Sequence, residues 1–174
     1  MKTGTLLGFT LLALAVAGMC GCAGTVNLTP QPTPPPALAP NATVAQLTLG
    51  IEGKLPPQSS IGGIDVTVNL PTGVTAKADK TSETIPGVVV TSGVAKGVQS
   101  VAKFTPGTDG APAQLRMVLL KLDGFGTGEF ATINLDISGS TPLVNNFSTT
   151  NMTISDTNGK TINGLTSTLA LQVK

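Results

Sequence analysis

The sequence predicts an all-β domain, built as an antiparallel β-sandwich. After Asn41, apolar residues alternate with polar or small ones in several short segments. Turn signals rich in Gly, Pro, Asn and Asp separate these segments, and no stretch shows a convincing helical period. Short alternating strands at near-regular spacing are typical of an antiparallel sandwich, not of a parallel sheet with crossover helices.

Five segments carry the alternation most clearly, and each is expected to turn one face to the core and a more polar face outward. Their apolar positions are Ala45, Leu47, Leu49 and Ile51; Ile64, Val66, Val68 and Leu70; Leu115, Met117 and Leu119; Ala131, Ile133, Leu135 and Ile137; and Leu169, Leu171 and Val173. Asn158-Gly159 at the tip of Thr157–Lys160 predicts a tight hairpin.

Residues 1–21 predict a secretory signal peptide. Lys2 precedes an apolar run of about a dozen residues, shorter than the roughly 20 that a membrane-spanning helix needs. Met19-Cys20-Gly21-Cys22 resembles the lipid-modification site of bacterial lipoproteins, which implies cleavage before Cys22 and acylation of that residue. Ala23-Gly24 follows, without Asp, as in the outer-membrane-directed class of diderm bacteria. The alternative is an ordinary signal peptide cleaved nearby.

Residues 22–42 predict a tether, and residues 43–174 the folded domain. Thr25–Asn41 holds six of the thirteen prolines. Proline-rich segments prefer the extended polyproline II conformation, so this one could hold the domain roughly 50 Å from its anchor. We therefore expect an exported protein in the cell envelope, anchored by a lipid in the outer membrane or located extracellularly.

Composition excludes much chemistry. The chain has no His, Trp or Tyr, and no Cys after Cys22, which rules out Ser-His-Asp and Cys-His catalysis and histidine-ligated metal sites. Without Lys2 the nine basic residues balance nine acidic ones, so nothing favours nucleic acid or an anionic membrane as partner. We expect no cofactor, no metal and no enzyme activity.

Two loops could carry a site. In Leu122–Phe130, Asp123 and Glu129 could pair as in glycoside hydrolysis. The favoured alternative is a Gly-rich β-turn in which Asp123 caps the turn and Phe125 covers the end of the sandwich. Asp156–Gly159 could suggest calcium, but it lacks the twelve-residue loop spacing, and hairpin turn chemistry explains it without metal.

The polar side of the predicted strands could bind a partner. Thr132 and Asn134 are examples, and a flat polar face of this kind could recognise a protein or a glycan by hydrogen bonds. The alternative is a solvated sheet surface with no partner. Exposed sheet edges also invite strand addition by a partner.

The order of several motifs resembles the cohesin domain over about Val44 to Val173. These are GGIDVTVNLPTGVTAK, a Gly/Val-rich middle, LRMVLLKLDGFGTGEFATINLDI and ISDTNGKTI, with Ala131–Ile137 where the alternating Ala-Thr-Ile strand of cohesins lies. The resemblance implies a nine-stranded jelly-roll sandwich. It also implies a protein partner, since cohesins bind the calcium-loaded dockerin domain through one sheet face.

The sequence leaves three hypotheses for the function of this protein. The first is a surface lipoprotein whose cohesin-like domain binds a protein, dockerin-like or another envelope protein. The second is a carbohydrate-binding module for a polysaccharide, in which only Phe104, Phe125, Phe130 or Phe147 could stack on a sugar. The third is a glycoside-acting enzyme. The candidate binding residues are Asp123, Phe125, Glu129, Thr132 and Asn134.

Overall fold

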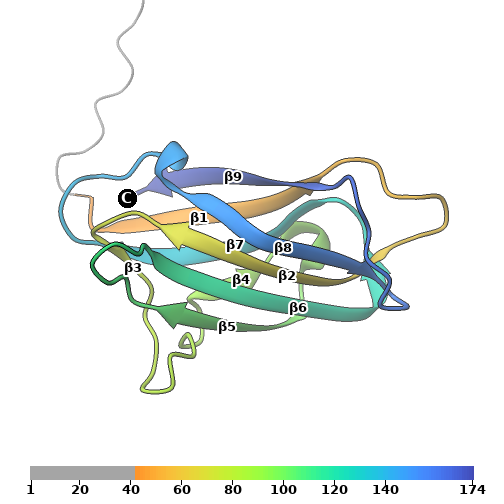
Figure 1. Cartoon of the computed structure of the whole chain (residues 1–174), viewed down its shortest axis with the longest axis horizontal. Helices are drawn as coiled ribbons and strands as arrows, with labels where there is room; N and C mark the ends of the chain where they lie inside the picture. The colour runs from red at the N-terminus through yellow and green to blue at the C-terminus, as the bar shows by residue number, and fades with distance from the viewer. Residues whose placement is uncertain (1–41) are drawn as a thin grey trace, which may run out of the picture. The chain divides into compact units, whose positions relative to one another are not determined.

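Nine strands pair into two antiparallel sheets that face each other as a β-sandwich (Figure 1). The computed structural model describes residues 42–174, so the predicted signal peptide, Cys22 and almost all of the tether lie outside the described residues. The strands are β1 (Val44–Glu52), β2 (Ile61–Leu70), β3 (Val74–Thr75), β4 (Val89–Thr91), β5 (Gln99–Thr105), β6 (Ala113–Phe125), β7 (Gly128–Ile137), β8 (Ser148–Asp156) and β9 (Thr166–Val173).

The prediction of an all-β sandwich is confirmed. One sheet has the order β3–β7–β1–β9, with β4 also pairing with β7, and the other has the order β5–β6–β2–β8. Helix is limited to two short 3-10 turns within the described residues, η1 (Gly93–Ala95) and η2 (Val144–Asn146). The chain passes from sheet to sheet repeatedly, so most strands pair with strands distant in sequence.

The core lies between the sheets and is formed by the residues that the alternation selected. All the predicted inward positions of β1, β2, β6 and β7 are buried. Leu169, Leu171 and Val173 of β9 are only half buried, because β9 is the last strand of its sheet. Both sheets and this core lie within residues 42–174, and the chain has no cysteine there, so we expect this domain to fold by itself.

A β-bulge in β7 departs from simple alternation. Ala131 pairs with Leu49, whereas Glu129 pairs with Gly50, so Phe130 is an extra residue on β7. Phe130 and Ala131 are consequently both fully buried although they are adjacent. The bulge thus brings a large ring into the core beside an alanine.

Leu122–Phe130 joins two strands that do not pair with each other, so this Gly-rich segment is a crossing between the sheets and not a hairpin. β6 pairs with β2 and β5, while β7 pairs with β1, β3 and β4. Gly126 and Thr127 therefore carry the chain from one sheet to the other. Asp123 and Glu129 lie on strands of different sheets, not on two arms of one hairpin.

The predicted turn at Asn158-Gly159 is present. Asp156 Oδ1 accepts hydrogen bonds from the backbone N–H groups of Asn158 (2.8 Å) and Lys160 (2.9 Å). Strand pairing after this turn is limited to the bridge between Ser155 and Thr161, because the chain then crosses to β9 in the other sheet. No helix within residues 42–174 has the length and apolar character that crossing a membrane requires.

Candidate binding face

The outer face of the β5–β6–β2–β8 sheet, which we call the candidate face, is the surface turned toward the viewer in Figure 1. Strand register arranges its positions in four rows, because residues at alternate positions share a face. The rows are Thr105, Gln114, Asn69 and Ser148; Lys103, Arg116, Thr67 and Thr150; Val101, Val118, Asp65 and Thr153; and Gln99, Leu120, Gly63 and Ser155.

Apolar side chains occupy one end of this face. Val101 is 55% exposed and Leu120, in the next row, is 64% exposed; Val118 lies half buried in the same row as Val101. We call Val101, Val118 and Leu120 the apolar strip. Gly63 stands opposite Leu120 and has no side chain to cover it. Large apolar residues exposed side by side are a feature of interaction surfaces, whereas single ones are ordinary.

Next to the apolar strip, the only arginine of the chain is held by a bidentate ion pair. Arg116 Nε donates to Asp65 Oδ1 at 3.0 Å, and Arg116 Nη2 donates to Asp65 Oδ2 at 2.6 Å. These hydrogen bonds lower the pKa of Asp65 and, although partial burial acts in the opposite direction, the attraction of the guanidinium adds to the lowering. The pair fixes the orientation of a guanidinium whose side chain is still 64% exposed.

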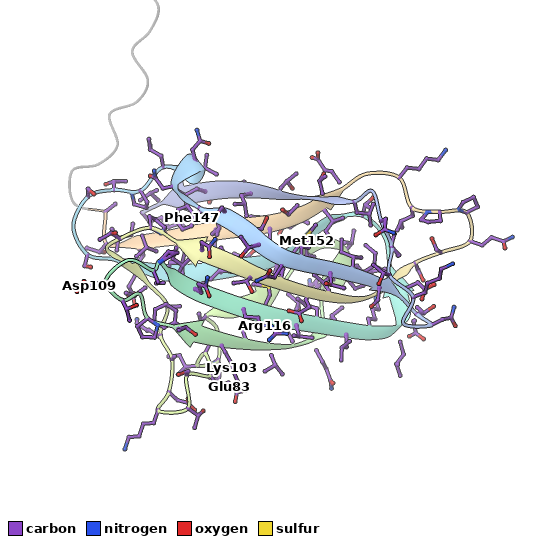
Figure 2. The ribbon with its side chains drawn as sticks, viewed as in Figure 1. Glu83, Lys103, Asp109, Arg116, Phe147 and Met152 are labelled. Atoms are coloured by element: carbon purple, nitrogen blue, oxygen red, sulfur yellow. The ribbon has the colours of Figure 1, made fainter. Side chains whose placement is uncertain are left out.

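Polar side chains fill the other end of the candidate face. Gln114 Nε2 donates to Asn69 Oδ1 and Asn69 Nδ2 donates to Ser148 Oγ, each at 3.0 Å. A shallow hollow of about 540 Å³ lies between these groups and the ion pair. Figure 2 shows Arg116 near the middle of the face, with Lys103 and Glu83 toward the β5 edge. The candidate face therefore combines an apolar end, a fixed cation and ordered hydrogen-bonding groups.

Thr132 and Asn134, predicted as binding residues, lie on the outer face of the other sheet. Asn134 Nδ2 donates to the carbonyl of Gly87 (2.8 Å), and Asn134 Oδ1 accepts from Gln46 Nε2 (3.3 Å). Thr132 Oγ1 donates to Ser92 Oγ (3.3 Å). These contacts tie the segment around β4 to β7 and β1, which gives both side chains a role within their own sheet.

The remaining predicted residues do not form a common site. Asp123 is exposed near the end of β6, and Glu129 is exposed on β7 in the other sheet. Phe125 is only 6% exposed, because its ring packs into the core, so it offers almost no surface to a ligand. Within residues 42–174, no three Asp, Glu, His or Cys side chains gather as metal ligands would.

The aromatic rings named for sugar stacking are all buried. Phe104 is 7% exposed, Phe125 6%, Phe130 0% and Phe147 5%. The chain has no Trp or Tyr. A stacking platform needs a ring face open to the ligand, so none of these four residues can supply one in this conformation.

The candidate face was not identified from the sequence. The sequence of β6 nevertheless contains an indication of it. Val118 and Leu120 occupy outward-facing positions of this strand, where simple alternation would place polar residues. Apolar residues in both phases indicate either a strand buried on both sides or an exposed apolar surface. Only the strand order shows that no further layer covers this sheet within the described part of the chain.

The fold and the candidate face define an antiparallel β-sandwich with one uncovered sheet face of mixed apolar and charged character. No family model and no curated protein matches this chain. Among solved structures, a non-cellulosomal cohesin from the hyperthermophilic archaeon Archaeoglobus fulgidus is similar, with a TM-score of 0.47 and 12% sequence identity. The match covers 71% of this chain and 75% of the cohesin.

Proposed function

We propose that this protein is a binding module that holds a protein partner on the candidate face, outside the cell and tethered by its N-terminus. The observation that carries the proposal is the apolar strip lying directly beside the fixed guanidinium of Arg116. Protein interfaces combine an apolar centre with a polar rim, and arginine is enriched among the residues that dominate their affinity. The motif resemblance to cohesins favours the same class of partner.

The chemistry of the face favours a protein over a polysaccharide. Glycan sites commonly use an open aromatic ring, and each Phe of the described residues is buried. The candidate face offers instead aliphatic side chains, one guanidinium, and amide and hydroxyl groups. Binding to polysaccharides in a glycan array, unaffected by changes on the candidate face, would support the carbohydrate-binding alternative.

The test is affinity capture from envelope extracts with immobilised residues 42–174. Leu120→Asp places a carboxylate in the apolar strip, and burying it against a partner should weaken binding at least about tenfold, because an unpaired charge is costly to desolvate. Leu143→Asp is the matched control, since Leu143 is 57% exposed but lies next to η2, away from the face. Proteins held equally by the wild type and Leu120→Asp would refute the proposal.

Arg116→Lys provides a second variant on the candidate face. It keeps the charge but loses the planar group that bonds both carboxylate oxygens of Asp65. We expect weaker capture with an unchanged fold, because a lysine is not held in one orientation.

The tether and its lipid anchor are part of the proposal. The resemblance of Met19–Cys22 to a lipoprotein site implies an acylated Cys22, and two or more acyl chains would make anchoring stable. Metabolic labelling with a fatty-acid analogue should mark the wild type but not Cys22→Ser. Equal labelling of both forms would place the acceptor elsewhere.

A further inference from the structure

Strand β9 has the one long sheet edge to which no other backbone segment hydrogen-bonds within the described residues. The edge of β5 is covered, because Thr84 N–H donates to the Ala102 carbonyl (2.9 Å) and Phe104 N–H donates to the Ser82 carbonyl (2.8 Å). Asp79 Oδ1 holds the covering loop by accepting from Thr81 and Glu83. The part of this edge around Lys103 is therefore already occupied and cannot accept a further strand.

The other two edges are blunted in different ways. β8 carries a bulge, because the three residues of β2 from Asp65 to Thr67 oppose the four residues of β8 from Thr150 to Thr153, and Asn151 has a φ of 51°. At the far end of the other sheet, β3 and β4 are only two and three residues long. Bulges and short strands are the usual means by which proteins prevent unwanted edge pairing.

β9 has none of these features. It runs for eight residues, TSTLALQV, with no proline, no charge and no shift in its register with β1. Lys174 and Val44 exchange two backbone hydrogen bonds, so even-numbered residues of β9 point their N–H and C=O groups toward β1. Odd-numbered residues point theirs to the open edge. These are Ser167, Leu169, Leu171 and Val173.

The same residues leave apolar surface uncovered. Leu169, Leu171 and Val173 face the core but are only half buried. η2 packs near β9, but its backbone makes no hydrogen bond to this strand within the described part of the chain. An added strand would therefore satisfy backbone groups and cover side chains at once.

We propose that this edge pairs with β9 of a second copy of the chain, in antiparallel orientation about a two-fold axis through Ala170. The sequence of β9 is self-complementary in this register. Leu169 meets Leu171 of the partner copy and Ser167 meets Val173 as hydrogen-bonded pairs. The two Lys174 residues lie at opposite ends of the joined strands, so no like charges meet.

Ala170 fits its place on the axis. Even-numbered residues form the close, non-hydrogen-bonded pairs of this arrangement, with Cα atoms about 4.5 Å apart. Ala170 is small and exposed, so two copies can approach without a clash. Because β9 carries no charge, it has no pattern that would favour a strand of different sequence over its own copy. Joining the two edges closes the interface in an isologous dimer.

The test compares lysine at Ala170 with lysine at Thr48. Ala170→Lys places two ammonium groups across the axis, and we expect it to weaken dimerisation at least about tenfold, with partial recovery in high salt. Thr48 lies on β1, pairs with Ala170 and also faces outward. In the dimer the two copies of Thr48 would be separated by three strand spacings, about 14 Å. Thr48→Lys should therefore dimerise like the wild type.

Sedimentation equilibrium of residues 42–174 measures these dissociation constants. Disulfide formation gives a second readout that does not depend on a loss of association. Ala170→Cys should form a covalent dimer on oxidation, and Thr48→Cys should not, since the domain has no other cysteine. The proposal is overturned if the wild type is monomeric at every concentration. It is also overturned if Ala170→Cys forms no covalent dimer, or if Ala170→Lys dimerises as well as Thr48→Lys.

Discussion

The variant Phe130→Ala tests whether β7 contains the bulge or follows simple strand alternation. With Ala131 facing the core, alternation would place Phe130 outside, whereas the bulge buries it completely. Removing a fully buried Phe side chain costs about 3–5 kcal/mol, from lost apolar burial and the remaining cavity. Total stabilities are about 5–15 kcal/mol, so a large part of the folding free energy should be lost.

Urea unfolding followed by circular dichroism measures this loss. For a domain of this size the midpoint should fall by roughly 2 M, with little change in the dependence on urea. Glu129→Ala is the matched control, because Glu129 is exposed and adjacent, and it should stay within about 0.5 kcal/mol of the wild type. If Phe130→Ala lost less than about 1 kcal/mol, the ring would be at the surface and the bulge would be wrong.

Two further predictions concern a turn and an ion pair. Gly73→Ala should destabilise the domain by about 1–3 kcal/mol in the same urea assay, because Gly73 has a φ of 81° and an added Cβ would clash with the Ser138 carbonyl. Gly87→Ala is the control and should cost less, because Gly87 has a φ of 88° but open space around it. Asp65→Asn should cost no more than about 1 kcal/mol at neutral pH, because the pair is partly exposed. The pKa of Asp65 is lowered in the folded state, so the pair stabilises the fold above the unfolded pKa of about 4 and this contribution disappears as the pH falls through the lower, folded value. The stability difference between wild type and Asp65→Asn should therefore vanish in acid, and a difference that persisted there would contradict the assignment.

The sequence predicted the strands whose side chains divide cleanly between core and solvent. β1 and β2 are examples, because every second residue is a large aliphatic one and the side-chain period of a strand is two. β5 and β8 were missed. β8 has only Ile154 fully in the core and is otherwise largely polar, since it lies at the end of its sheet, so its periodicity is weak.

The candidate face shows the same limit. The binding residues predicted from the sequence include neither Arg116 nor Leu120. Four of the five predicted binding residues lie on the other sheet or in the core, namely Glu129, Thr132, Asn134 and Phe125. Residues adjacent in sequence were grouped into one site at Leu122–Phe130, although the chain changes sheets there. Pairing between distant strands decides which residues become neighbours on a surface.

The sequence by itself determined the all-β class, the inward faces of the main strands and the lack of catalytic residue types, because these depend on local period and composition. Only the tertiary structure decided the sheet to which each strand belongs, the burial of Phe130 and the union of Val101, Arg116 and Leu120 on one face. These features arise from hydrogen bonding and packing between segments far apart in the chain. The residues that form them carry no local pattern that specifies their partners.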